Sequence, residues 1–265
     1  MAAEKIKPLK NFGQNFLQDK NIATKIISKL GDIADKQIIE IGPGMGALTE
    51  ILLANDAKVT AFDIDLRAIE FLQNKFAGMP NLSLVHSDIR EVKLEDYIDT
   101  KTLVIGNIPY NITNDILFWL FAHSDVIQKA VLTVQREVAQ RYVATPRTKD
   151  YGITTLAMQL YGKAKIEFHI PASAFYPAPK VTSSVLSIDF TDAPQLDVDK
   201  YYLLKLIRAA FSQRRKMLSN ALQQFLTMQS ITTDAIPTNY AKLRAEELSL
   251  TDYIRLYNAL FLHLN

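Results

Sequence analysis

The feature that most constrains the fold is the alternation of short apolar runs with helical stretches between residues 37 and 190. Seven runs have the length and composition of β-strands, at 37–41, 58–62, 82–85, 102–105, 130–134, 164–169 and 184–190. Stretches with helical periodicity at 47–55, 68–76 and 114–122 separate the early runs. Strands that alternate with helices form a mostly parallel sheet with helices on both faces, so the sequence predicts an α/β, Rossmann-like fold with seven strands.

The last two runs are predicted to pair differently from the others. A proline-rich segment from Pro171 to Pro179, without a clear helix, lies between them. Parallel neighbours need a long crossover, usually a helix, so this connection indicates an antiparallel pair at the end of the sheet. After Asp192 the pattern becomes helical, at 198–226 and about 239–264. We therefore expect an α/β domain of residues 1–193 and a small all-helical domain of residues 194–265.

Four predicted strands end in residues that suit ligand binding better than packing. The segments are Glu40-Ile41-Gly42-Pro43-Gly44-Met45-Gly46 after the first strand, Asp63 after the second, Asp88 after the third and Gly106-Asn107-Ile108-Pro109-Tyr110-Asn111 after the fourth. Ligands of open α/β sheets bind beyond the carboxyl ends of the strands, and an acid about 20 residues after a glycine turn can hold ribose hydroxyls. The pattern indicates a nucleoside-like ligand.

The glycine turn distinguishes between two such ligands. Dinucleotide folds favour Gly-x-Gly-x-x-Gly with the pyrophosphate at a helix N-terminus, whereas this turn is Gly-x-Gly-x-Gly beside Glu40. An acid there repels phosphate but suits S-adenosylmethionine, which has a cationic sulfonium, an α-amino group and no phosphate. The sequence therefore favours a methyltransferase over a dehydrogenase, with cofactor-binding candidates Glu40, Gly42, Gly44, Asp63 and Asp88.

The turn after the fourth strand suits an aromatic amine. Asn107 has an amide oxygen that accepts hydrogen bonds, and Pro109 fixes φ and lacks a backbone donor. Tyr110 offers a flat ring on which a base can stack. Hydrogen bonds from an exocyclic amine to such acceptors favour a pyramidal nitrogen and free its lone pair to attack an electrophilic methyl group. We therefore predict that Asn107, Pro109 and Tyr110 are catalytic.

Several segments together resemble one enzyme family. Residues 107–110, Asn-Ile-Pro-Tyr, are similar to the (Asn/Asp)-Pro-Pro-Tyr-type motif of amino-methyltransferases that act on adenine or cytosine. The other matching segments are the glycine turn, Gly13-Gln14-Asn15-Phe16-Leu17, Lys149-Asp150-Tyr151-Gly152, Phe175-Tyr176-Pro177-Ala178-Pro179-Lys180-Val181-Thr182-Ser183 and Ala210-Phe211-Ser212-Gln213-Arg214-Arg215-Lys216. The chain resembles the KsgA/RsmA-type small-subunit ribosomal RNA adenine dimethyltransferases, which implies the class I methyltransferase form of the Rossmann-like fold.

The resemblance also implies a substrate and residue roles. The family transfers two methyl groups from S-adenosylmethionine to each of two adjacent adenines in a hairpin near the 3′ end of small-subunit (16S) rRNA, which suggests a role in small-subunit biogenesis. The implied roles are Asn15 and Leu17 over the methionine end of the cofactor, Asp63 on the ribose, Asp88 on the cofactor adenine, Asn107 on both cofactor and target amine, and Tyr110 with Phe175 around the flipped adenine. An alternative places Phe175 in a rigid proline-rich loop that packs on the core.

Three positions depart from the family pattern. Ile108 stands where leucine is more common, Asp63 replaces a common glutamate, and Arg147 occupies the place of a small residue. The shorter acid changes the cofactor geometry slightly, and the extra cation strengthens a phosphate contact or is simply solvated. None of the three argues against activity.

A basic segment near the C-terminal end predicts RNA binding. As one helix, residues 203–218 would place Lys205, Arg208, Arg215 and Lys216 on one face and Arg214 in the middle of the apolar face. A buried unpaired arginine is costly, so we expect a helix break near Ser212 that turns Arg214 outward. The predicted RNA-binding residues are Arg147, Lys149, Lys180, Arg208, Arg214, Arg215 and Lys216. For Lys180, exposure without RNA contact is an equal alternative.

Composition narrows the remaining possibilities. The chain has no cysteine, which fits a reducing compartment, and its four histidines lack ligand spacing, so we expect no metal site. It has no apolar signal core and no run approaching the ~18–20 apolar residues of a membrane span. We expect a cytoplasmic monomer that acts on small-subunit rRNA or an immature small ribosomal subunit. Two alternatives stay open: an antibiotic-resistance methyltransferase of large-subunit rRNA, and an assembly factor in which catalysis is secondary.

Overall fold

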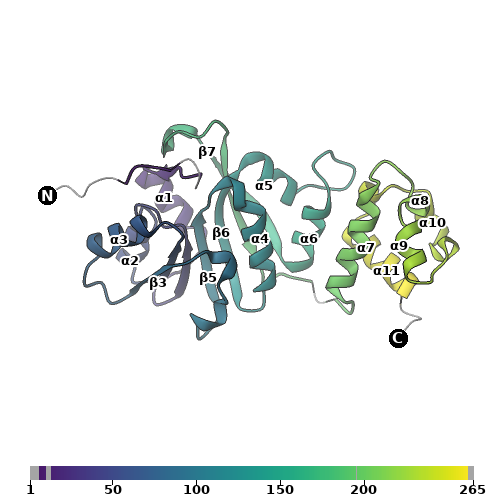
Figure 1. The fold of residues 1–265 in the computed structure, drawn as a ribbon, viewed down its shortest axis with the longest axis horizontal. Helices are drawn as coiled ribbons and strands as arrows, with labels where there is room; N and C mark the ends of the chain where they lie inside the picture. The colour runs from purple at the N-terminus through teal and green to yellow at the C-terminus, as the bar shows by residue number, and fades with distance from the viewer. Residues whose placement is uncertain (1–5, 10–12, 195, 262–265) are drawn as a thin grey trace. The chain divides into compact units, whose positions relative to one another are not determined.

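A computed structural model describes residues 6–9, 13–194 and 196–261 of the chain. The chain divides into two compact units (Figure 1), the first formed by Met1–Ala139 with Lys163–Asp192 and the second by Gln140–Gly162 with Ala193–Asn265. The division after Asp192 lies one residue from the expected boundary, and residues 140–162 also group with the helical unit. Of the helical segment expected at 239–264, residues 262–264 lie outside the described part of the chain.

The first unit contains the predicted seven-stranded sheet, in the order β4-β3-β2-β5-β6-β9-β7. Its strands are β2 (Gln37–Ile41), β3 (Lys58–Asp63), β4 (Leu82–His86), β5 (Thr102–Asn107), β6 (Ile127–Gln135), β7 (Lys163–Ile170) and β9 (Ser183–Asp189). The pairs from β4 to β6 are parallel. Strand β9 is antiparallel to both β6 and β7, which confirms the antiparallel pair expected at the end of the sheet.

The helices of this unit are α1 (Lys20–Ile27), α2 (Thr49–Ala54), α3 (Leu66–Lys75), α4 (Thr113–Ala122) and α5 (Arg136–Tyr142), the last of which continues into the second unit. Helices α1, α2 and α3 cover one face of the sheet and α4 the other (Figure 1). The side chains of Asp19 and Asp65 cap α1 and α3, each accepting a hydrogen bond from a backbone N–H in the first turn. Ile38, Leu103 and Val131 of the sheet share a buried apolar core with α1 and α2.

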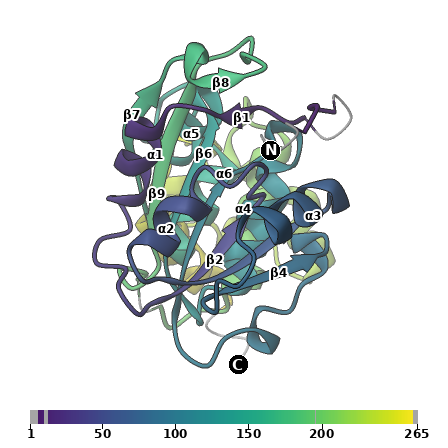
Figure 2. The same cartoon turned by 90° about the vertical axis from the view of Figure 1, so that its left-hand side faces the viewer.

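A second, two-stranded sheet was not predicted. Strand β1 (Phe16–Leu17) pairs antiparallel with β8 (Phe175–Tyr176), so that Leu17 lies opposite Phe175 (Figure 2). Two of the segments that carry the family resemblance, far apart in the sequence, are therefore side by side. Neither strand is long enough to show a periodic signal, which explains why the pattern analysis missed them.

The second unit is helical, with α6 (Ile153–Tyr161), α7 (Lys200–Ser212), α8 (Leu218–Ala221), α9 (Gln223–Met228), α10 (Thr238–Ala241) and α11 (Leu250–Phe261). Its core contains two tyrosines whose hydroxyls donate to backbone carbonyls, Tyr151 to Leu248 at 2.8 Å and Tyr253 to Ala245 at 2.9 Å. The predicted helix break is confirmed, since α7 ends at Ser212 and Arg214 lies in the connection to α8.

Short 3-10 helices complete both units, at Ile89–Glu91, Leu94–Asp96, Tyr110–Ile112, Ala172–Ala174, Thr233–Ala235 and Ala245–Glu247. Among the described residues, no helix combines the length and the apolar character that crossing a bilayer requires.

Candidate active site

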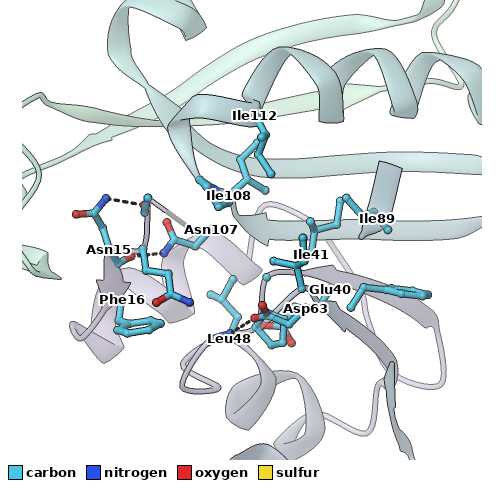
Figure 3. A pocket seen from close by; sticks show the side chains of 18 of the residues that line it. Asn15, Phe16, Glu40, Ile41, Leu48, Asp63, Ile89, Asn107, Ile108 and Ile112 are labelled. Atoms are coloured by element: carbon cyan, nitrogen blue, oxygen red, sulfur yellow. Dashed lines mark hydrogen bonds between the residues drawn. The ribbon is translucent and has the colours of Figure 1, made fainter. Parts of the chain in front are cut away.

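A cavity of about 230 Å³ lies at the carboxyl ends of β2, β3, β4 and β5 and is also lined by residues 13–17 (Figure 3). Ten predicted site residues line it: Asn15, Leu17, Glu40, Gly42, Gly44, Asp63, Asp88, Asn107, Pro109 and Tyr110. All belong to the first unit. The parallel strands bring these positions together because their carboxyl ends share one edge of the sheet.

The glycine turn is shaped by positive backbone angles and close packing. Gly42 and Gly44 have φ angles of 66° and 54°, a region that glycine enters without a steric penalty. A Cβ atom on Gly44 would lie 2.8 Å from the ring of Phe16, whereas one on Gly42 would meet only the Asn107 carbonyl, at 3.9 Å. The turn therefore approaches both the N-terminal segment and the end of β5.

Asp63 is the buried acid of the cavity, with 8% of its surface exposed. One carboxylate oxygen accepts from the backbone N–H of Gly44 at 3.2 Å and the other from that of Asp65 at 2.9 Å. Burial raises the pKa of Asp63 to about 6, against the lowering effect of these two hydrogen bonds. Each oxygen keeps a lone pair for a further donor.

Glu40 lies deeper than Asp63 and is 1% exposed. Its carboxylate accepts a hydrogen bond from Thr49 Oγ1 at 2.7 Å. Burial raises the pKa of Glu40 to about 7, and the negative charge of Asp63 adds to that effect. Near neutral pH this side chain is therefore only partly ionised, which weakens the attraction to a cation that the sequence suggested for it.

Asp88 is paired with Arg90, a residue that the sequence analysis did not single out. The Arg90 guanidinium donates to both carboxylate oxygens, Nε to Oδ1 at 2.9 Å and Nη2 to Oδ2 at 2.5 Å, and holds the pKa of Asp88 below its usual value. Asp65 and Arg67 form the same pairing. The repeated pattern Asp-x-Arg at 65–67 and 88–90 is a sequence signal that would have revealed both pairs.

Asn107 is held by the N-terminal segment. Its amide nitrogen donates to the Asn15 backbone carbonyl at 2.8 Å, a contact drawn in Figure 3. A carbonyl only accepts, so this contact assigns the orientation of the amide and leaves Oδ1 free of donors among the described residues. The segment itself is anchored by Gln14, whose amide nitrogen donates to Asp65 Oδ2 at 2.8 Å. Sequence reasoning did not assign a role to Gln14.

The two predicted stacking rings lie in different environments. The Tyr110 ring lines the cavity and its hydroxyl is hydrogen-bonded to Ser183 Oγ at 2.5 Å; burial raises the pKa of Tyr110. Phe175 is 4% exposed, does not line the cavity and packs in the apolar core that includes Leu17. This position agrees with the alternative of a loop packed on the core.

The predicted RNA-binding residues are exposed with one exception. Arg147, Lys149, Arg208, Arg215 and Lys216 are exposed on the second unit and Lys180 on the first. Arg214 instead donates to the carboxylate of Glu246 and, through Nη2, to the carbonyls of Thr148 and Lys149 at 3.2 and 3.1 Å. Its guanidinium therefore fixes the 145–151 loop within the second unit.

Comparisons with known proteins show the family of the chain and its fold. Residues 6–260 match the profile of the family described as ribosomal RNA adenine dimethylase. The ribosomal RNA small subunit methyltransferase A of Streptococcus gordonii is 38% identical over 264 residues, covering 95% of this chain and 91% of that protein. The crystal structure of a dimethyladenosine transferase from Plasmodium falciparum superposes with a TM-score of 0.78 at 25% identity, covering 92% and 97% of the two chains. The 23S rRNA methyltransferase ErmE has a TM-score of 0.69 at 23% identity, covering 93% and 99%, and shares the fold.

Proposed function

Because the chain belongs to the ribosomal RNA adenine dimethylase family and is an S-adenosylmethionine-dependent methyltransferase, we propose that it dimethylates two adjacent adenines of small-subunit rRNA. The target is a hairpin near the 3′ end of the 16S molecule, and the modification takes place during small-subunit biogenesis. We propose that the protein acts in the cytoplasm as a monomer, and that its partner is an immature small ribosomal subunit. Residues 1–193 bind the cofactor and the target base, and residues 194–265 bind RNA.

The residues of the cavity fit the cofactor. The two oxygens of Asp63 have lone pairs for ribose hydroxyls, and the glycine turn lets the backbone approach a ligand closely. Among the described lining residues Arg90 is the single basic one, and it is paired with Asp88 and Asp115, so none offers a free cation to a phosphate. We assign cofactor binding to Asn15, Leu17, Glu40, Gly42, Gly44, Asp63, Asp88 and Asn107.

The orientation of Asn107 is the observation that carries the mechanism. Bound S-adenosylmethionine supplies an electrophilic methyl group on a positively charged sulfur. Asn107 Oδ1 accepts an N–H of the target adenine amine, since its Nδ2 is held by the Asn15 carbonyl. The Pro109 carbonyl accepts from Ile112 N at 3.3 Å and shares the single Thr113 hydroxyl hydrogen with the Tyr110 carbonyl, whereas Asn107 Oδ1 accepts from no donor among the described residues.

That hydrogen bond favours a pyramidal amine nitrogen, whose lone pair attacks the methyl carbon as the carbon–sulfur bond breaks and its electrons stay on sulfur. The methylated amine then releases one proton to solvent. The amine is neutral, so no base needs to remove a proton before the attack. Tyr110 stacks on the flipped adenine, and Phe175 is proposed as the second ring. Extruding the base costs a few kcal/mol, and less in a single-stranded loop.

The decisive experiment supplies labelled cofactor and immature small subunits to the purified protein, followed by digestion and nucleoside analysis. We expect label in dimethyladenosine of small-subunit rRNA, with unmodified large-subunit RNA as the matched control. Label in large-subunit RNA would support the antibiotic-resistance alternative instead. If the protein binds small subunits but no label is found in dimethyladenosine, the result would favour the assembly-factor alternative.

A further inference from the structure

Two adjacent tyrosines lie exposed at the start of α7 in the second unit. Tyr201 is 62% exposed and Tyr202 48%, and their ring centroids lie 5.7 Å apart in an edge-to-face arrangement. The helix beneath them is fixed, because Leu203, Leu206 and Ile207 are fully buried. The helix therefore holds both rings in solvent, where flat apolar surface is available to a partner.

Two cations accompany these rings on the same helix. Lys205 Nζ lies 4.3 Å from the ring centroid of Tyr201 and 5.0 Å from that of Tyr202, and Arg208 is exposed one turn further on. Neither cation has an ion-pair partner in the part of the chain that the structure describes. We call Tyr201, Tyr202, Lys205 and Arg208 the α7 platform.

The sequence that contains the platform is rich in cations. Residues 200–226 contain six cations and no acid. The neighbouring acid in the sequence, Asp199, caps α7, and one of its oxygens accepts from the backbone N–H groups of Tyr201 and Tyr202 at 2.8 and 3.1 Å. An aromatic surface beside unpaired cations matches a partner that combines planar rings with negative charge.

We propose that the α7 platform binds an unpaired nucleotide of the rRNA, at a place distinct from the adenine that is methylated. A tyrosine ring stacks on the base, while Lys205 and Arg208 contact the flanking phosphates. This inference rests on the proposed function, because it takes RNA as the substrate. An acidic protein surface would use the cations but would leave the flat faces of the two rings without a matching group.

Stacking and charge can be separated by the salt dependence of binding. The probe is in vitro transcribed small-subunit rRNA, titrated with the full chain at several salt concentrations. We expect the double variant Tyr201→Ala/Tyr202→Ala to bind at least about 5-fold more weakly at every salt concentration, with an unchanged slope, because tyrosine displaces no counterions. Lys205→Gln should instead reduce the slope of log K against log salt by about 0.7.

Two further variants control for loss of folding. Tyr201→Phe/Tyr202→Phe keeps both rings and should bind as the wild type does. Met228→Ala removes another large side chain of the same unit, which is 72% exposed, and should not change binding. Thermal unfolding checks that all variants are folded.

Wild-type affinity of the double alanine variant would overturn the inference. Photo-crosslinking from position 201 in immature subunits provides a second measure, with crosslinks to RNA expected and crosslinks to a ribosomal protein alone contradicting it. The proposed function fails separately, since it predicts methyl transfer by the wild type. At saturating RNA the double alanine variant should keep the wild-type turnover rate. Its KM for RNA should be higher than that of the wild type.

Discussion

The cavity has a side proposed for the cofactor and a side proposed for the target base. The two sides differ in how many of their predicted residues line the cavity. On the cofactor side, all eight predicted residues line the cavity, and the two acids nearest its surface are held by internal hydrogen bonds, Asp63 by backbone N–H groups and Asp88 by Arg90. On the base side, Asn107 and Tyr110 line the cavity but Phe175 is buried in the core beside it.

The difference indicates that the two ligands make different demands on the protein. The residues proposed to bind the cofactor are already in place, so we expect its binding to require little rearrangement. A target base that is stacked on both rings requires Phe175 to leave part of the apolar core, and with it the β1–β8 pairing of Leu17 and Phe175 to adjust. We therefore expect cofactor binding to be insensitive to changes on the base side, and RNA binding to be sensitive to them.

The largest effect is expected from Asn107→Ala, which removes the proposed acceptor for the target amine. Methyl transfer should fall by about 100-fold or more, as when one preorganised polar group is removed from an active site. Initial rates with labelled cofactor and immature small subunits measure the change. Cofactor affinity, measured by equilibrium dialysis, should partly survive.

Asn74→Ala is the matched control for this variant, because Asn74 is an exposed asparagine on α3 whose amide nitrogen donates to the Glu70 carbonyl and, among the described residues, makes no other hydrogen bond. It should transfer methyl groups at the wild-type rate. A rate for Asn107→Ala within a few-fold of the wild type would remove the central role assigned to Asn107.

Asp63→Ala tests the cofactor side alone. Hydrogen bonds to a charged group contribute about 1.5 to 3 kcal/mol, so the loss of the ribose contact should weaken cofactor binding by about 10- to 100-fold. Isothermal titration with the cofactor measures this change, and the affinity for RNA should stay the same. An equal loss of RNA affinity would show that the two sides are not independent.

Phe175→Leu tests whether the buried ring ever serves the base. Leucine keeps most of the apolar burial but loses the flat face, so the KM for RNA should rise by about 5-fold or more if Phe175 stacks on the adenine. Phe118→Leu, at a ring that is 36% exposed on α4, is the control and should leave the KM unchanged. A wild-type KM for Phe175→Leu would confine this residue to core packing.

The fold and the gathering of the strand-end residues at one cavity could be predicted because they follow from local patterns. The apolar runs define the strands, and parallel strands place Gly42, Asp63 and Asn107 at one edge of the sheet whatever their separation in the sequence. The antiparallel end of the sheet followed from the missing crossover helix between 164–169 and 184–190. Likewise, the cost of burying Arg214 predicted the end of α7.

Other features depend on contacts that no local pattern shows. Strands β1 and β8 have two residues each and lie about 160 residues apart in the sequence. Their pairing therefore leaves no periodic pattern in the sequence. The burial of Phe175, the Gln14–Asp65 hydrogen bond and the partial neutralisation of Glu40 are consequences of packing around the cavity. Sequence identifies such side chains but not the partners that set their environment.

The smallest predicted effect is a dependence of cofactor affinity on pH. Burial raises the pKa of Asp63 to about 6, so its carboxyl group is mostly ionised at pH 7.5 and mostly protonated at pH 5. Only the ionised form offers both oxygens as charged acceptors, and charged acceptors bind donors more tightly by about 1 kcal/mol. Affinity should therefore fall as the pH decreases through 6, by about 5-fold between pH 7.5 and pH 5.

Glu40 titrates in the same range, because its pKa is about 7, and the two carboxyl groups must be separated. Asp63→Asn removes the ionisation at the surface of the cavity and should give a lower affinity that no longer falls below pH 6. Glu40→Gln keeps an acceptor for the Thr49 hydroxyl and should retain the wild-type midpoint near 6. If the dependence persists in Asp63→Asn and disappears in Glu40→Gln, then Glu40 rather than Asp63 governs the pH dependence of cofactor binding.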